Sequence, residues 1–150
     1  MKFEDGRKLD FDDVLIKPKR STLATRSGVD ITREYDYLHA LSTDVLVPIV
    51  AANMDTTGTF DMANVLKEHN MHTCLHKHYS PEALIKFFSD HPDNTSWLTI
   101  GIKKEDVEKL DAVKVKLGHI PRICIDVANG YQQVFVDHVK KIREENPYAV

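Results

Sequence analysis

The chain has 150 residues, of which 42% are hydrophobic and 29% are charged, and its formal net charge is −3. This composition is typical of one globular domain rather than a disordered chain, and the small acidic excess offers no basic surface for a nucleic acid partner. No apolar run approaches the roughly 18 residues that span a bilayer, so we expect no membrane partner.

Residues 1–45 come first along the chain, and we expect them to be irregular. They are polar, contain Pro18 and Gly28, and carry only short apolar pieces. From residue 46 onward, short apolar runs alternate with longer amphipathic segments. The apolar runs are bounded by polar or turn residues and predict strands. The predicted strands are residues 47–54, 72–77, 96–102 and 122–128, and a fifth strand begins at 148–150.

The amphipathic segments between these runs predict four helices. The first covers residues 59–70, and the second begins after Ser80, a suitable N-cap that is followed by proline. The third covers residues 104–118 and ends in glycine, whereas the fourth covers 131–147 and ends in proline. Both residue types commonly stop a helix.

Strand and helix therefore alternate four times, which predicts an α/β fold with parallel strands. Residues 46–150 would form βα units 1–4 and the start of strand 5 within a single domain. Two architectures fit this pattern. One is a complete flavodoxin-like sheet, and the other is the first half of a (β/α)8 TIM barrel, which needs about 250 residues. The strand starts recur every 24 to 26 residues, and this period does not separate the two.

In both architectures ligands bind at the carboxyl ends of the strands. Asp126 directly follows an apolar strand, where a carboxylate needs a partner. It is either a site residue or the N-terminal cap of the fourth helix. Lys77 is either a solvated lysine at a strand end or a cation directed at a phosphate or a reacting group. The segments selected by this rule are residues 52–56, 77–79, 101–103 and 126–130.

Histidine and cysteine alternate in one short segment, at His72, Cys74, His76 and His78. On a strand these side chains would share one side and extend over roughly 20 Å. One zinc ion has ligand bonds of about 2.0 to 2.3 Å and cannot reach all four. We therefore expect no metal site in this chain.

The two cysteines, Cys74 and Cys124, lie inside predicted strands, where a thiol is usually an inert core residue. Neither position suits a nucleophile, which needs a neighbouring base. Two cysteines without a disulfide framework favour a reducing compartment, and residues 1–13 contain no apolar segment of a secretory signal. We therefore expect a cytoplasmic protein.

Four sequence blocks, in this order along the chain, resemble one enzyme family. They are LDFDDVLIKPKRSTL (9–23), VPIVAANMDTTGTF (47–60), HKHYS (76–80) and IDVANGY (125–131). Together they look like the amino-terminal half of the GMP reductases, in the IMP dehydrogenase/GMP reductase family of (β/α)8 barrels. Dehydrogenases of this family usually carry a regulatory insertion near the position of residues 87–94, and this sequence has none. The last two blocks are also more similar to the reductases.

The resemblance implies an NADPH-dependent oxidoreductase of purine salvage. Enzymes of this kind reduce GMP to IMP and release ammonia, with a cysteine that attacks the purine and a cofactor that supplies the hydride. The resemblance places that cysteine, a potassium-binding loop and the phosphate-binding loops in the second half of the barrel. It also implies a homotetramer, and it implies that residues 1–150 alone are inactive.

The resemblance further implies roles for eight residues and leaves two alternatives open. Lys77 and Asp126 would have supporting roles in catalysis, and Asn53 and Met54 would contact the purine of the substrate. The residues expected to contact NADPH are Thr25, Arg26, Lys77, Asp126, Val127 and Ala128. The alternatives are an IMP dehydrogenase-like barrel enzyme and a non-catalytic half-barrel that binds nucleotide.

Overall fold

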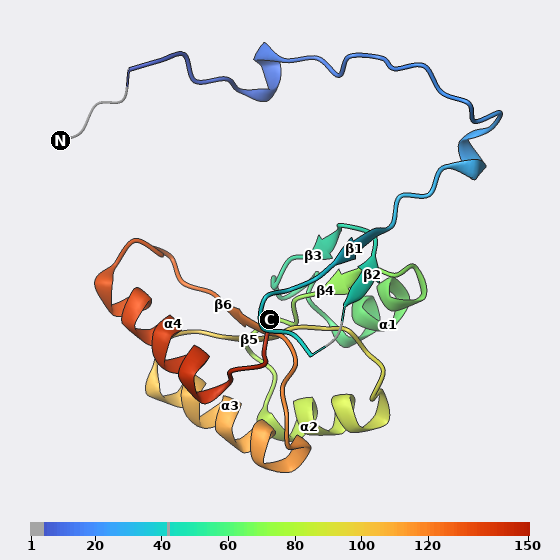
Figure 1. Cartoon of the computed structure of the whole chain (residues 1–150). Helices are drawn as coiled ribbons and strands as arrows, with labels where there is room; N and C mark the ends of the chain where they lie inside the picture. The colour runs from blue at the N-terminus through green and yellow to red at the C-terminus, as the bar shows by residue number, and fades with distance from the viewer. Residues whose placement is uncertain (1–4, 42) are drawn as a thin grey trace. The chain divides into compact units, whose positions relative to one another are not determined.

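The computed structural model describes residues 5–41 and 43–150, and its contacts divide the chain into two units, Met1–Asp30 and Ile31–Val150. The first unit contains two short 3-10 helices, η1 (Phe11–Asp13) and η2 (Arg26–Gly28) (Figure 1). The carboxylate of Asp10 caps η1 by accepting a hydrogen bond from the Phe11 N–H at 2.7 Å. Every described residue of this unit is exposed, so the unit has no core of its own.

Four short parallel strands form the centre of the second unit. They are β3 (Val50–Ala51), β4 (His72–Thr73), β5 (Leu98–Ile100) and β6 (Ile123–Ile125). β3 pairs with β4, β5 pairs with β6, and a bridge between Cys74 and Trp97 connects the two pairs. The strand order is therefore β3-β4-β5-β6. Each strand lies within a predicted one but is shorter, because only part of each apolar run pairs with a neighbour.

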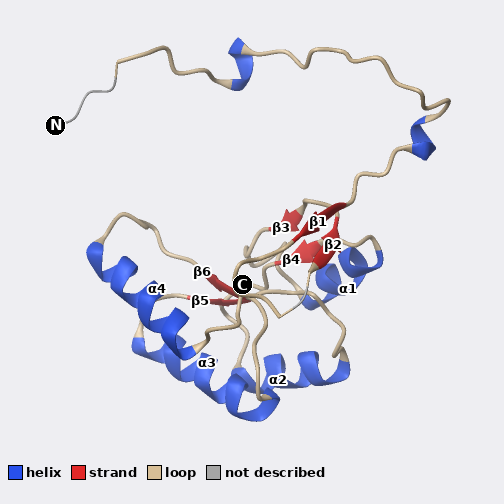
Figure 2. Ribbon diagram, in the orientation of Figure 1, coloured by secondary structure: helices blue, strands red, loops and turns tan. Residues whose placement is uncertain are grey.

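A helix follows each of these strands, which gives the βα alternation shown in Figure 2. The Ser80 hydroxyl accepts a hydrogen bond from the Ala83 N–H at 3.2 Å, as an N-cap does. The third helix stops where Gly118 takes a φ of 77°, a value that L side chains rarely adopt. The α/β class and these local helix signals are thus confirmed. The helices are α1 (Phe60–Glu68), α2 (Pro81–Asp90), α3 (Lys104–Leu117) and α4 (Gln133–Glu145).

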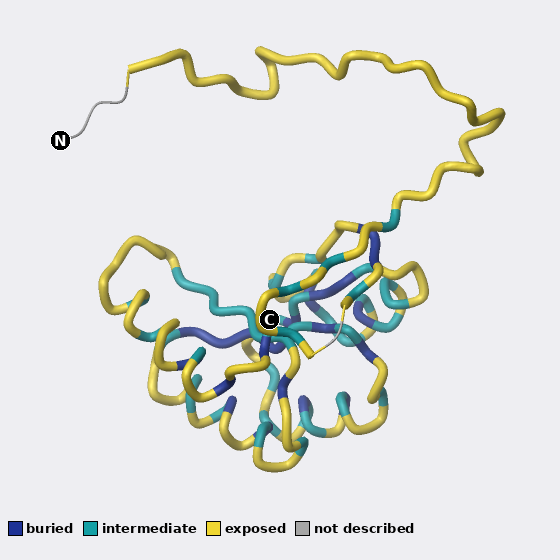
Figure 3. Tube along the Cα trace, in the orientation of Figure 1, coloured by how far each residue is buried: buried dark blue, intermediate teal, exposed yellow. Residues whose placement is uncertain are grey.

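The hydrophobic core lies between the strands and the helices. Successive strand residues point to opposite faces of a sheet, so alternate residues meet the helices. Leu75, Leu98 and Ile100 belong to the same cluster as Leu110 and Val113 of α3, and each of the five is at most 1% exposed. Figure 3 colours the buried residues dark blue; they include all of β4 and β5 and single positions of the helices, whereas β3 and β6 contain none.

A β-hairpin occupies part of the segment that the sequence pattern presents as irregular. β1 (Arg33–Tyr35) and β2 (Asp44–Leu46) pair in antiparallel fashion. Asp44 forms an ion pair at 2.6 Å with Arg122, which directly precedes β6, so the hairpin contacts the amino end of the sheet. Strands of three residues are too short to show a clear alternation of polar and apolar side chains. The expectation of irregular structure is therefore wrong for this hairpin.

Residues 148–150 do not form the expected start of a fifth strand, although Val150 lies along β6. The Val150 N–H donates to the Pro121 carbonyl at 2.9 Å, and the Ile123 N–H donates to the Val150 carbonyl at 3.0 Å. These two hydrogen bonds are those that one residue of a parallel strand makes to its neighbouring strand. Only Val150 of this segment takes part in them, so the segment does not form a strand.

The segment with alternating histidine and cysteine is also not one continuous strand. β4 ends at Thr73, and the chain turns at residues 77–79. His72 is 1% exposed, and its Nδ1 accepts a hydrogen bond from the Trp97 Nε1–H at 2.8 Å. The His76 ring instead stacks on Tyr79, with the ring centroids 3.9 Å apart. Within residues 5–41 and 43–150, no group of three or more acidic, histidine or cysteine side chains is arranged to hold a metal ion.

None of the helices in the described part of the chain is long and apolar enough to cross a membrane.

We predict that His72 makes the stability of the fold depend on pH. Burial, and then the nearby Arg122 guanidinium, lower the pKa of His72 from 6.5 to about 4. In the unfolded chain the imidazole takes up a proton near pH 6.5, whereas in the folded chain it stays neutral and keeps its bond from Trp97. This stability is therefore fully present above pH 6.5 and is lost as the pH falls to about 4. The total loss expected is up to about 3 kcal/mol.

Urea unfolding at several pH values between neutral and mildly acidic checks this prediction. His72→Gln is the comparison, because the amide oxygen still accepts from Trp97 but does not titrate. The free energy of unfolding of the variant should fall less steeply with decreasing pH than that of the original chain. Identical slopes in the two proteins would show that His72 does not carry the pH dependence.

Candidate functional site

A cleft with a volume of about 270 Å³ lies at the carboxyl ends of β4, β5 and β6. We call it the strand-end cleft. It is lined by residues that follow these three strands, by the first turn of α3 and by the residue that precedes α4. The carboxyl ends of the strands are where the sequence predicted ligand binding. Its lining residues are Lys77, Gly101, Ile102, Lys103, Asp106, Asp126, Val127, Ala128, Asn129 and Gln132.

Lys77 and Asp126 approach each other in the strand-end cleft. The Lys77 Nζ lies 3.9 Å from the Asp126 Oδ2, and the two side chains are 42% and 44% exposed. A half-exposed ion pair of this length is weak, so both groups can rearrange around a ligand. The Asp126 N–H donates to the Ile100 carbonyl at 2.9 Å, which fixes the backbone.

The structure excludes one of the two interpretations of Asp126. The N-cap residue of α4 is Gln132, and it makes no side-chain cap bond, so the interpretation of Asp126 as the helix cap is wrong. The structure instead brings Asp126 together with Lys77, Val127 and Ala128 in one cleft. Their predicted roles in cofactor binding and catalysis stay predictions.

Lys109 of α3 is a residue of this region that the sequence analysis missed. Its ammonium group donates a hydrogen bond to the Lys77 carbonyl and so holds the backbone that carries the Lys77 side chain. Burial lowers the pKa of Lys109, Asp106 acts in the opposite direction, and Lys77 adds to the lowering. Helical spacing places Lys109 on α3 but does not indicate that it reaches across to another strand end, so no sequence signal identifies it.

The first turn of α3 forms another side of the strand-end cleft. The Asp106 Oδ2 accepts a hydrogen bond from the Lys103 N–H at 3.2 Å and thereby caps the helix. A Cβ atom at Gly101 would lie 2.6 Å from the same oxygen, so the glycine leaves room for the capping carboxylate. Lys103 also lines the cleft, where its charge adds to the positive end of the helix dipole.

Asn53 and Met54 lie in the turn after β3, and neither is among the residues that line the strand-end cleft. The Gly58 N–H closes the turn by donating to the Met54 carbonyl at 2.7 Å. Asp55 connects the turn to the next strand end, because its Oδ1 lies 3.2 Å from the His78 Nε2. The predicted contact of Asn53 and Met54 with a purine stays a prediction.

Thr25 and Arg26 belong to the first unit. Thr25 is the N-cap residue of η2, and its hydroxyl shares a hydrogen bond with the Ser27 hydroxyl at 2.8 Å. Both residues are exposed. The strand-end cleft is lined by residues of the second unit, so the predicted contact of Thr25 and Arg26 with NADPH also stays a prediction.

The two cysteines lie on the face of the sheet that does not meet the helices. Cys124 is paired with Thr99 and Cys74 with Trp97, and paired residues point to the same face. A hydrogen bond from the Cys74 thiol lowers the pKa of Cys124 to about 7, whereas this bond and burial raise the pKa of Cys74. Cys124 is therefore more acidic than the inert core thiol expected from its position, but it does not line the strand-end cleft.

The strand-end cleft has the groups needed for a ligand that carries phosphates and hydroxyls. The ammonium groups of Lys77 and Lys103 suit phosphate oxygens. The Asp126 carboxylate can accept hydrogen bonds from hydroxyls, and the amides of Asn129 and Gln132 can both donate and accept. A dinucleotide cofactor presents all of these groups, so the residues fit such a molecule.

Comparison with known proteins gives consistent matches. The IMP dehydrogenase / GMP reductase domain matches residues 8–150. The chain is 46% identical to a GMP reductase of Phytophthora infestans, over 97% of this chain and 41% of that protein. It is 45% identical to GMP reductase 2 of Homo sapiens, over 93% of this chain and 41% of that protein. The chain thus spans about two fifths of the length of the curated relatives it matches.

The structure is similar to a solved structure as well. The crystal structure of inosine 5' monophosphate dehydrogenase from Legionella pneumophila superposes with a TM-score of 0.71 and 26% sequence identity. The match covers 89% of this chain and 40% of that chain.

Proposed function

The chain belongs to the IMP dehydrogenase / GMP reductase family, and from this membership we propose that it acts as the amino-terminal part of an NADPH-dependent GMP reductase. The observation that carries the proposal is the identity of 42 to 46% to curated proteins named GMP reductase. The reaction would convert GMP, NADPH and a proton into IMP, ammonia and NADP⁺. The proposed place of the reaction is the cytoplasm, and the proposed assembly is a homotetramer, both by resemblance to the family.

We also propose that residues 46–150 supply the first four βα units of an eight-unit barrel. The continuous order of β3 to β6 supports this arrangement, as does the likeness to a dehydrogenase structure of which the chain covers 40%. The alternative of a complete flavodoxin-like sheet has no such support from the relatives. In the barrel, the nucleophilic cysteine and the potassium-binding loop would come from sequence outside this chain.

The strand-end cleft would hold the cofactor in this proposal. Lys77 and Lys103 would bind its phosphate groups, and Asp126, Asn129 and Gln132 would bind hydroxyl and amide groups. NADPH supplies the hydride when bound. Lys77 and Asp126 would also orient the reacting groups, because they are the charged pair at the ends of two strands that a barrel directs toward one centre. Lys109 would position Lys77 through the bond to its carbonyl.

The GMP reductase activity of a fusion protein tests the proposal. The 150-residue chain is fused to the remaining sequence of the Phytophthora infestans GMP reductase and compared with the chain alone. The fusion should oxidise NADPH when GMP is added and release ammonia, while the chain alone should not. Reduction of NAD⁺ with IMP, and no reaction with GMP, would support the dehydrogenase alternative instead. If the fusion has neither activity but the 150-residue chain is folded and binds GMP, the result would support the non-catalytic half-barrel.

Lys77 and Asp126 can be tested by substitution in this fusion. Lys77→Ala and Asp126→Ala should each lower kcat by on the order of 100-fold, because loss of orientation at the reacting centre affects the rate. The KM for GMP should change much less, since neither residue is proposed to hold the substrate. Steady-state kinetics of NADPH oxidation measures both constants.

Lys86→Ala and Asp90→Ala are matched controls, because this lysine and this carboxylate form an exposed pair on α2. Both should leave kcat within the error of the measurement. An unchanged kcat in Lys77→Ala and Asp126→Ala as well would remove these two residues from the reacting centre.

A further inference from the structure

A second cleft lies at the opposite end of the sheet from the strand-end cleft. Its walls come from the last turns of α2 and α3 and from the chain that leads into β5 and β6, so we call it the α2–α3 cleft. Ser96 and Arg122 line it, and these residues precede β5 and β6. Lys77 and Asp126 by contrast follow strands. The α2–α3 cleft has a volume of about 360 Å³, within the usual range for small-molecule sites.

The described side chains that line the α2–α3 cleft include basic groups but no acidic ones. Its described lining includes Lys116, His119 and Arg122 and no carboxylate. Arg122 is already paired with Asp44, so its charge is largely balanced. Lys116 is exposed and forms no ion pair with any residue in 5–41 or 43–150, so its ammonium group is available to a ligand. The charge therefore favours an anion.

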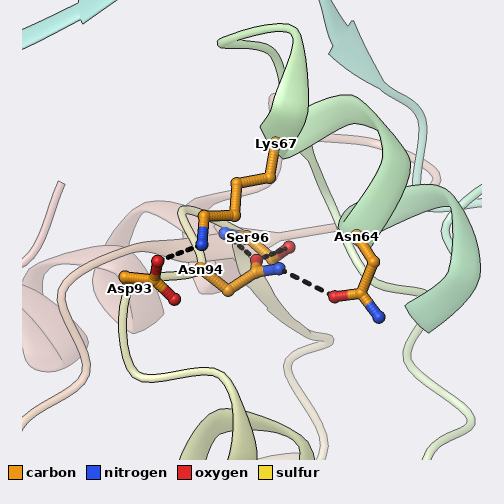
Figure 4. Close-up of polar contacts among 5 residues, drawn as sticks. All are labelled: Asn64, Lys67, Asp93, Asn94 and Ser96. Carbon is orange, nitrogen blue, oxygen red and sulfur yellow. Dashed lines mark hydrogen bonds and ion pairs between the residues drawn. The ribbon is translucent and has the colours of Figure 1, made fainter.

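A polar wall of the α2–α3 cleft is fixed in place by hydrogen bonds (Figure 4). Asn94 and Ser96 are both buried, and the Asn94 Oδ1 accepts from the Ser96 N–H at 2.9 Å and from its hydroxyl. The Asn94 Nδ2 donates to the Asn64 Oδ1 at 3.4 Å, which ties this segment to α1. The neighbouring Asp93 forms an ion pair with Lys67, also on α1. A wall that is already ordered costs little additional entropy when a ligand binds.

The remaining walls of the α2–α3 cleft are apolar. Phe88 contributes an aromatic ring from α2, and Leu117 and Ile120 contribute aliphatic side chains from the end of α3 and the following loop. Phe88 and Leu117 are partly buried against the core, and Ile120 is 3% exposed. An occupant of this cleft therefore needs an apolar body in addition to a charge.

We propose that the α2–α3 cleft is a binding site for a small aromatic anion, with the ring against Phe88 and Leu117 and the anionic group at Lys116. The Asn94 amide has two N–H groups, of which Asn64 accepts one, so it can add a hydrogen bond to the ligand. The site is built from units two and three of the βα series and shares no lining residue with the strand-end cleft. It is therefore separate from the proposed NADPH and GMP chemistry.

Phenyl phosphate is a suitable probe, because it combines a ring with an anion. The ¹⁵N-labelled 150-residue chain is titrated with it, and amide chemical shifts are followed by NMR. The shifts of residues 88–89, 94–96 and 116–120 should move together and saturate. Phenol, which lacks the anion, and inorganic phosphate, which lacks the ring, should each bind at least about tenfold more weakly.

Lys116→Gln removes the charge at an exposed position and should weaken phenyl phosphate binding about tenfold without a change for phenol. Lys140→Gln, at an exposed lysine of α4 outside the cleft, is the matched control and should leave the affinity unchanged. Saturating shifts that occur only elsewhere on the chain would overturn the proposal. Equal binding of phenol and phenyl phosphate, or an unchanged affinity in Lys116→Gln, would also overturn it.

Discussion

Replacement of Arg122 by methionine should lower the free energy of unfolding by about 3 to 5 kcal/mol. One guanidinium nitrogen of Arg122, Nη2, lies 2.6 Å from each carboxylate oxygen of Asp44. The two side chains are only 12% and 15% exposed. Methionine keeps much of the apolar volume but leaves the Asp44 carboxylate nearly buried without a charged partner. Urea unfolding at neutral pH measures the loss.

Two further variants separate this effect from a general effect of charge removal. Lys86→Met breaks an ion pair whose side chains are 77% and 53% exposed, so it should destabilise the fold much less than Arg122→Met does. The double variant Asp44→Asn/Arg122→Met should be less destabilised than the sum of the two single variants, because each single variant already removes the pair. A cost for Arg122→Met no larger than that for Lys86→Met would show that the pair does not hold the hairpin to the sheet.

Replacement of Gly58 by alanine should cost about 3 kcal/mol or more. A Cβ atom at this position would lie 2.3 Å from the Cys74 carbonyl oxygen, 2.9 Å from the His76 nitrogen and 3.0 Å from the Ala52 carbonyl oxygen. All three are backbone atoms, which cannot move aside as the end of a flexible side chain can. The turn after β3 would have to shift and lose the bond that the His76 N–H donates to the Gly58 carbonyl at 2.8 Å.

Gly130→Ala is the matched control, because a Cβ there would meet the Phe135 ring at an ordinary contact distance of 3.6 Å. Thermal and urea unfolding of both variants should show a large loss for Gly58→Ala and a small change for Gly130→Ala. In the fusion with the rest of a GMP reductase, Gly58→Ala should also lower activity, since it displaces the turn that carries Asn53 and Met54. Equal stability of the two variants would mean that the turn has room to move.

The strand-end cleft could be located only approximately from the sequence. A general rule, that ligands meet the carboxyl ends of parallel strands, pointed to Lys77, Asp126, Val127 and Ala128, and the structure groups these four. The same rule also pointed to Asn53 and Met54, which lie outside the cleft lining. Lys109 had no signal, because its contact with the Lys77 carbonyl joins residues 32 positions apart.

The sequence by itself determined the alternation of strands and helices and the helix ends at Ser80 and Gly118. These features depend on caps, backbone conformation and periodicity within a few residues, so local physical chemistry is sufficient to specify them. Only the tertiary structure decided the length of each strand, the β1–β2 hairpin and the pairing of Asp44 with Arg122, 78 positions away. Such features depend on which distant segments meet in the fold. A buried backbone group needs a hydrogen-bond partner and a buried charge needs an opposite charge, and here those partners are far away in the sequence.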